Sequence, residues 1–425
     1  MNSIADKLTD NDKKSQPIRF ITPLNLIKVL NKSIPFLVGI YIFFNPFPHT
    51  TAIKEICFYL SVFIVIILIL SKKKDFTLKT PLLLPFGIFI LWSLLSIFFA
   101  INKENSIHDF YSHLIRYAIL YYILINFFNS EKHLLYLSWI IVISSTIFIM
   151  GGIIYFYFIL GNPLSARFGV HSFVQTPVNI IGIISIFAIF LALNNFNNER
   201  QLSHKIFFVG SLLVLTIGIF LTQSRSTLIA IFVGGFFFFF NDKKQLFVFI
   251  SFFLIIIVLS PIRNRFSPDY HGGFKHNRRI DISYITLEVI KDYPLTGIGF
   301  GLQSYENLDL KKYRKELGSK KYRKRRIITD PHNMVLDIAV RLGVIGLAFS
   351  FYIVFVFFKM CRNIIKHGKS IFLKSWGRSL GAAFIAVTII GLFYPIFSHM
   401  PEVVFCLIFS MLTIVYRLNT AAIIV

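Results

Sequence analysis

The chain is a succession of long apolar stretches separated by short polar ones. A helix crossing a hydrocarbon core of about 30 Å needs about 20 apolar residues, and twelve stretches come close to that length. In lipid, every backbone N–H and C=O must be bonded within its own segment, so runs of Phe, Ile and Val here predict helices, not strands. The predicted spans are residues 33–47, 53–70, 80–99, 114–128, 134–160, 177–193, 206–222, 226–240, 245–260, 334–358, 377–396 and 400–416.

One polar interruption, residues 261–333 between the ninth and tenth predicted spans, is much longer than the others. Within it, apolar residues at helical spacing predict a short helix from Arg279 to Asp292, which Pro294 and a glycine-rich run end. A second polar helix is predicted from about residue 303 to 317. We therefore expect an all-α polytopic membrane protein of about 12 transmembrane helices. Residues 1–425 would form a single integral membrane domain, with one large loop that contains short helices.

Composition and charge fix the expected orientation. Hydrophobic residues make up 55% of the chain, too many for a soluble domain of this length, and the net charge is +24. Lys and Arg gather in the short loops of one side, which predicts cytoplasmic termini and a periplasmic 261–333 loop. Long loops cross the membrane largely regardless of charge, so the basic residues of that loop do not oppose this assignment. No cleavable leader is expected, because the first 33 residues are polar and basic. The opposite short loops hold only Lys54, Lys103, Arg116, Arg167 and Arg225.

Two groups of arginines are candidates for binding an anion. Arg225 lies in the very short polar break 222–227, at the predicted external boundary. Its planar guanidinium can hold two phosphate oxygens at once, whereas the alternative is a helix hairpin with an arginine that reaches out to water. Arg278 and Arg279 begin the predicted loop helix, where cations oppose the helix dipole unless an anion is bound nearby.

A histidine at the end of the long loop is the candidate general base. His332 stands directly before an apolar span, and its neighbours Asp330 and Asn333 could orient the ring. Imidazole titrates at about pH 6.5 and can accept a proton near neutrality. The alternative is a solvated surface histidine. The cysteines have no metal-ligand spacing, so no metal site and no cofactor are expected; they are Cys57, Cys361 and Cys406.

Taken in order, these residues resemble the O-antigen ligase family of membrane glycosyltransferases, which is related to O-antigen polymerases and bacterial O-oligosaccharyltransferases. The resemblance is concentrated in residues 222–350. Ser283 departs from it, since family members commonly carry Trp there, and the segment from Arg167 to Asn179 matches only loosely. The matching features are Ser224-Arg225-Ser226, Arg279, the run from Asp292 to Gly299, His332-Asn333, and the run from Gly343 to Gly346.

The resemblance implies a metal- and nucleotide-independent glycosyl transfer in the bacterial inner membrane. The donor would be a glycan on undecaprenyl diphosphate at the periplasmic leaflet, and the acceptor a sugar hydroxyl of the lipid A–core oligosaccharide. His332 would be the catalytic base, and Arg225 and Arg279 would bind the diphosphate. The supporting residues would be Arg167, Arg278, Asp330 and Asn333.

Other functions remain open from the sequence. The same residues would serve an O-antigen polymerase or a protein O-oligosaccharyltransferase, and a flippase of lipid-linked glycans is the alternative from another class. The basic run 311–326 is either a solvated helix face or a contact for acceptor phosphates or lipid head groups. Asp337 and Arg341 have the spacing of an ion pair on one helix. Glu402 has no evident partner, and an external cluster either lines an acceptor entrance or is ordinary surface: His108, Asp109, His113 and Arg116.

Overall fold

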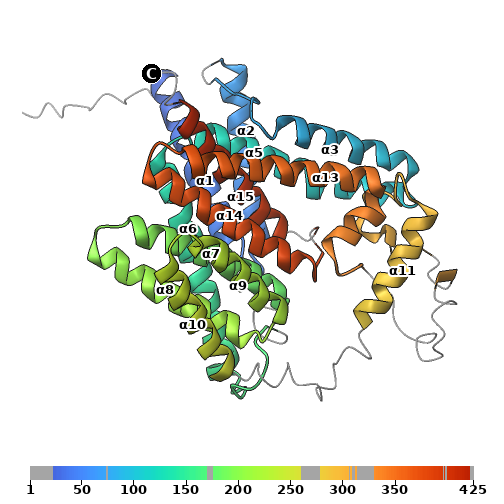
Figure 1. The fold of residues 1–425 in the computed structure, drawn as a ribbon. Coiled ribbons are helices and arrows are strands. Elements are labelled where there is room, and N and C mark those ends of the chain that lie inside the picture. The colour runs from blue at the N-terminus through green and yellow to red at the C-terminus, as the bar shows by residue number, and fades with distance from the viewer. Residues whose placement is uncertain are drawn as a thin grey trace, which may run out of the picture.

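The computed structural model describes residues 23–72, 75–169, 176–259, 278–305, 307–308, 312–313, 330–395, 397 and 400–421. Over these ranges the protein is helical and contains no strand (Figure 1), which confirms the all-α class. The helices are α1 (Pro23–Phe44), α2 (Thr51–Leu70), α3 (Leu83–Ser96), α4 (Lys103–Asp109), α5 (Arg116–Phe127), α6 (Glu131–Ile153), α7 (Val178–Asn198), α8 (Leu202–Leu221), α9 (Arg225–Phe239), α10 (Lys243–Leu259), α11 (Arg278–Asp292), α13 (Met334–His367), α14 (Ile371–Gly391) and α15 (Met400–Ala421).

Each of the twelve predicted spans coincides with a helix. Seven described helices are long and apolar enough to cross a bilayer, and α3 and α9 are shorter apolar helices. The three other predicted spans fall on α5, α10 and α14. The predicted loop helix is also confirmed, as α11. The number of crossings stays a prediction. The seven are Ile27–Phe44, Thr51–Leu70, Glu131–Ile159, Val178–Asn198, Leu202–Leu221, Met334–His367 and Met400–Thr420.

Helix α7 is the centre of the bundle. It contacts α6, α8, α9, α14 and α15, and most of its side chains are buried. Small residues permit this packing: a Cβ at Gly182 would collide with the side chain of Thr227 on α9. The outer helices α2 and α8 instead turn many Ile, Leu, Val and Phe side chains outward, as helices that face lipid do.

The helix pairing brings segments predicted to be external to one end of the bundle. Helices α7 and α14 are antiparallel, since Ser379 Oγ donates to the Phe190 carbonyl at 2.7 Å and Asn198 Nδ2 donates to Ser375 Oγ at 2.9 Å. The start of α7 therefore lies at the same end as the last residue of α14, Gly391.

The same end also holds the starts of α9 and α13. Side chains at the start of α9 bond Asn179 on α7, as described below, and Met334 of α13 lies against Gly391 of α14. Segments predicted to be cytoplasmic meet at the other end, where Lys369 N donates to Asn419 Oδ1 at 3.1 Å. This separation agrees with the alternation of sides predicted from the spans.

Candidate active site

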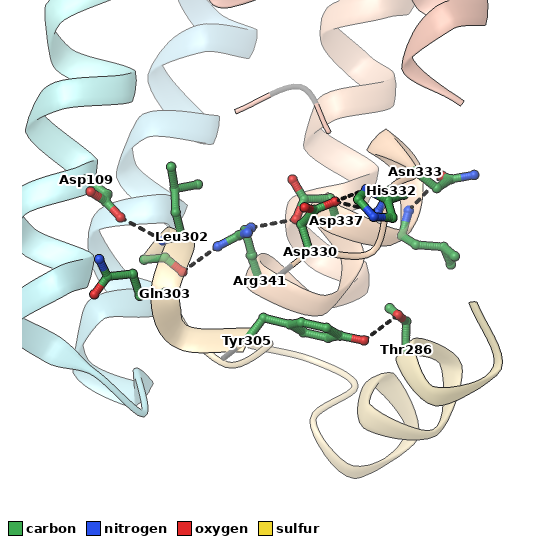
Figure 2. Close-up of polar contacts among 12 residues, drawn as sticks. Asp109, Thr286, Leu302, Gln303, Tyr305, Asp330, His332, Asn333, Asp337 and Arg341 are labelled. Atoms are coloured by element: carbon green, nitrogen blue, oxygen red, sulfur yellow. Dashed lines mark hydrogen bonds and ion pairs between the residues drawn. The ribbon is translucent and has the colours of Figure 1, made fainter. Parts of the chain in front are cut away.

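His332 has a left-handed backbone conformation that turns its side chain toward Asp330. Its φ is 51°, and its backbone N–H donates to Asp330 Oδ1 at 2.8 Å. The same oxygen lies 2.6 Å from the ring Nδ1 (Figure 2). Because Nδ1 faces the carboxylate, Nε2 on the opposite side of the ring is the nitrogen placed to take a proton from a substrate. The His332 side chain is 40% exposed, which leaves it accessible from outside the protein.

Asn333 fixes the backbone that follows His332. Its Oδ1 caps α13 by accepting from the backbone N–H groups of Val335 at 2.9 Å and Leu336 at 3.1 Å. Its Nδ2 donates to the Leu392 carbonyl at 3.0 Å. Asn333 therefore joins the start of α13 to the end of α14. The residue that orients the imidazole is Asp330.

Arg279 lies close to residues 392–393, which form the turn after α14. Its guanidinium carbon is 5.9 Å from the centroid of the Phe393 ring, next in sequence to Leu392, a distance at which a cation and an aromatic face attract each other. Asn333 and Arg279 thus both contact residues 392–393, and this turn connects the arginine to the histidine. Arg278 begins α11, and its side chain lies outside the described residues.

The apolar face of α11 holds Arg279 in this place. Ile282, Ile285 and Val289 are buried and pack with Ile298 and Val340. These three side chains have the helical spacing seen in the sequence, which explains why the short helix forms although its polar face is exposed. Beside them Tyr305, in the short 3-10 helix Leu302–Tyr305, donates from its hydroxyl to Thr286 Oγ1 at 2.7 Å.

Burial of Tyr305 raises the pKa of its phenol to about 12, so the hydroxyl stays a neutral donor. Sequence reasoning did not single out this residue. Of the predicted second loop helix, residues 303–317, the structure describes the 3-10 turn at its start and residues 307–308 and 312–313; the rest of it, and the basic run apart from residues 312–313, lie outside the described residues.

Arg225 occupies the first position of α9 between two buried serines. Ser224 and Ser226 both donate from Oγ to Asn179 Oδ1, at 3.3 and 3.2 Å. Ser224 also caps the helix by accepting from the Thr227 N–H at 3.4 Å. The serines therefore clamp the start of α9 to α7, and this holds the half-buried Arg225 at the end of the bundle.

The segment around Arg167 docks on the same break. Arg167 Nε donates to the Thr222 carbonyl at 2.9 Å, and Phe168 N donates to the Leu221 carbonyl at 3.0 Å. Gln223, with a φ of 50°, donates from Nε2 to the Ser165 carbonyl at 2.9 Å. The structure thus places Arg167 near Arg225, at the start of α9. It places Arg279 near His332, at the start of α13, and both pairs lie at the same end of the bundle.

Helix α13 is broken one-quarter of the way along, a feature the sequence did not reveal. Gly343 has φ 66° and ψ −174°, which divides α13 into a short helix, residues 334–342, and a long one. A break inside an apolar segment is tolerated where other protein groups satisfy the freed backbone. Here Ile298 N and Gly299 N donate to the carbonyls of Val340 and Arg341 at 2.9 and 3.0 Å.

Two more backbone groups at the break are also bonded. Trp92 Nε1 on α3 donates to the Leu342 carbonyl at 2.8 Å, and Val344 N donates to the Pro294 carbonyl at 2.8 Å. Residues 292–302, which begin with the Asp292–Gly299 motif, therefore form a strap across the broken helix, and the glycines of the strap permit the close approach. The glycines that permit the break and the strap are visible in the sequence, at 343 and in the run 297–301. Nothing in the sequence shows that these two segments contact each other.

The predicted ion pair of Asp337 and Arg341 is confirmed and is buried. Arg341 Nε lies 2.7 Å from Asp337 Oδ1, with 2% and 0% of the two side chains exposed. Arg341 Nη1 also donates to the Gly301 carbonyl. The next residue of the strap, Leu302, donates from its N–H to Asp109 Oδ2 at 2.7 Å (Figure 2).

The external cluster and Glu402 have partners inside the protein. Asp109 and His113 are buried, so the ordinary-surface interpretation was wrong for both. His113 Nδ1 is 2.7 Å from Glu402 Oε1, and Arg116 Nη1 is 2.8 Å from Glu55 Oε1. These contacts give the buried members of the cluster partners within the protein, and a role at an acceptor entrance stays a prediction.

A family model described as O-antigen ligase matches residues 210–351. No curated protein matches the chain. The matched region runs from the middle of α8 to beyond the break in α13, and so includes Arg225, Arg279 and the Asp330–His332 pair. The match confirms the resemblance seen in the sequence: residues 210–351 of this helical membrane protein are similar to the O-antigen ligase family.

Proposed function

We propose that the protein is a glycosyltransferase that moves a glycan from undecaprenyl diphosphate to a hydroxyl of the lipid A–core oligosaccharide. The reaction takes place at the periplasmic face of the bacterial inner membrane, with both termini in the cytoplasm. The observation that carries the proposal is the Asp330–His332 contact of 2.6 Å, at the end of the bundle that also holds Arg279 and Arg225. The match to the O-antigen ligase family supports the class of reaction.

His332 acts as the general base. The acceptor hydroxyl gives its proton to Nε2 while its oxygen forms a bond to the anomeric carbon. The bond from that carbon to the diphosphate oxygen breaks, and its electron pair leaves with undecaprenyl diphosphate. One direct displacement inverts the anomeric centre. Asp330 keeps the Nδ1 proton in place and stabilises the imidazolium that forms.

Arg225 and Arg279 bind the diphosphate and stabilise the charge that develops on it. A guanidinium matches phosphate geometry with two parallel N–H donors, and it needs no proton transfer to do so. Because these donors are held in place before the reaction, they lower the barrier more than mobile water does. Arg167 and Arg278 support the same anion. Asn333 holds the backbone between the base and α14.

Alanine at Arg225 or Arg279 is expected to weaken binding of undecaprenyl diphosphate and to lower the transfer rate by about 10²–10³-fold, the usual effect of losing one such donor. Binding of undecaprenyl diphosphate to the purified protein in nanodiscs measures the first effect. Arg200→Ala is the matched control, since Arg200 is an exposed arginine in a loop predicted to be cytoplasmic. Binding by both site variants at the wild-type affinity would remove the arginines from the donor site.

Lipopolysaccharide banding in a strain that lacks its ligase tests the acceptor. Long-chain bands restored by the wild-type protein support ligation to lipid A–core. Longer lipid-linked glycans without such bands would identify a polymerase that uses the same site. Transport of the lipid-linked glycan that does not depend on His332 would favour the flippase alternative.

A further inference from the structure

We infer that Arg341 is a positioning residue for His332, which it fixes through the short helix 334–342. The inference rests on the role proposed above for His332 as the base. Arg341 lies on the side of the break that carries the histidine, and it bonds both the short helix and the strap that crosses it.

The short helix depends on tertiary contacts for its place. Isolated helices shorter than about 12 residues are marginal in water, because the first turn costs more conformational entropy than its bonds return. At its start, Asn333 ties it to the Leu392 carbonyl. At its end, the carbonyls of Val340 and Arg341 accept from the strap. None of these bonds involves a side chain of the short helix, and Arg341 supplies that link.

Arg341 joins the short helix to the strap. Among the described residues, no other charged side chain makes a contact between these two segments. Its Nε lies 2.7 Å from Asp337 Oδ1, and its Nη1 donates to the Gly301 carbonyl. Gly301 is held in turn, since its N–H donates to Ser106 Oγ at 3.1 Å. The guanidinium therefore ties the short helix to α4 through the strap.

Asp337 transmits this attachment to the base. Its backbone N–H donates to the Asn333 carbonyl at 2.8 Å. Asp337 therefore lies one helical turn after Asn333, the neighbour of His332. Figure 2 shows Asp337 beside Asp330 and His332, with Arg341 on the other side of its carboxylate. Asp337 is fully buried, and the Arg341 guanidinium is the cation that contacts its carboxylate. If Arg341 is replaced, the short helix shifts, and His332, which precedes it, shifts with it.

Arg341→Met tests the inference by comparing transfer with donor binding. We expect kcat for glycan transfer to fall about 10–100-fold, the order of effect of a shift of about 1 Å in a reacting group. Binding of undecaprenyl diphosphate and KM for the donor should stay within about twofold, because Arg225 and Arg279 lie on α9 and α11 and not on the short helix. Arg341→Lys should recover part of the loss, since an ammonium can reach one of the two oxygens but not both. Wild-type kcat in Arg341→Met would overturn the inference.

Two further variants separate positioning from stability. Asp337→Leu with Arg341→Met removes the buried carboxylate that a single change would leave unpaired. If this double variant folds, it should still show the loss of kcat, and transfer at the wild-type rate would overturn the inference. Arg417→Met is the matched control, because Arg417 also donates to backbone carbonyls, those of Ile125 and Lys79, but at the opposite end of the bundle.

A double variant with His332→Ala shows whether Arg341 acts through the histidine. If it does, adding Arg341→Met to His332→Ala lowers the residual transfer little further, because residues that act as a unit are not additive. Losses that multiply would overturn the inference while leaving His332 as the base. Wild-type transfer by His332→Ala alone would instead remove the proposed function itself.

Discussion

His332→Ala is expected to lower the rate of glycan transfer by about 10²–10⁴-fold, the contribution of a positioned general base. Without the imidazole, the acceptor hydroxyl must lose its proton to water, and the attacking oxygen is a weaker nucleophile. Binding of undecaprenyl diphosphate should be unchanged, because the two arginines remain. The measurement is transfer by purified protein from a lipid-linked donor to lipid A–core, together with lipopolysaccharide banding at matched protein levels.

Asp330→Asn and His204→Ala make this result specific. Asparagine at 330 keeps an oxygen near Nδ1 but removes the charge that stabilises the imidazolium, so we expect a smaller loss than in His332→Ala. His204 is a matched control: it is also partly exposed and paired through Nδ1 with a carboxylate, Glu199, at 3.0 Å, in a loop predicted to be cytoplasmic. Equal transfer by the wild-type protein and His332→Ala would end the case for a histidine base.

Gly343→Ala is expected to cost the protein its stable fold around the break. The φ of 66° with ψ of −174° belongs to a region that essentially only glycine adopts, and strain of this kind costs roughly 1–3 kcal/mol. A Cβ at Gly343 would also collide with the backbone of Leu295 in the strap. The strap cannot withdraw without leaving the carbonyls of Val340 and Arg341 unbonded. Thermal unfolding of the purified protein should begin at a clearly lower temperature, and transfer should be lost with it.

Gly210→Ala is the control for that change. Gly210 lies within α8, and an added Cβ would have no neighbour within 4 Å. Because alanine has the higher helix propensity, this substitution should be neutral or slightly stabilising. If Gly343→Ala were as stable as Gly210→Ala, the break in α13 would not be a rigid part of the fold.

The class of the fold was predictable because the membrane leaves few choices. Apolar stretches of bilayer length must be helices, since only a helix bonds its own backbone, and every predicted span coincides with one. The helix α11 was predictable for a similar reason: Ile282, Ile285 and Val289 repeat at helical spacing, and these are the side chains it buries. Likewise, the four-residue spacing of Asp337 and Arg341 predicted their ion pair.

The helices, the order of the motifs and the resemblance to the O-antigen ligase family were thus predictable, because each depends on residues close together in the chain. The assembly of the site was not predictable, because it depends on how the helices pack. Arg279 meets Phe393, Asn179 receives Ser224 and Ser226, and the strap crosses the break at Gly343. These contacts join residues far apart in sequence, where no periodicity connects them. They form because a helix broken in a membrane must find new partners for its backbone, and the fold alone determines which segment supplies them.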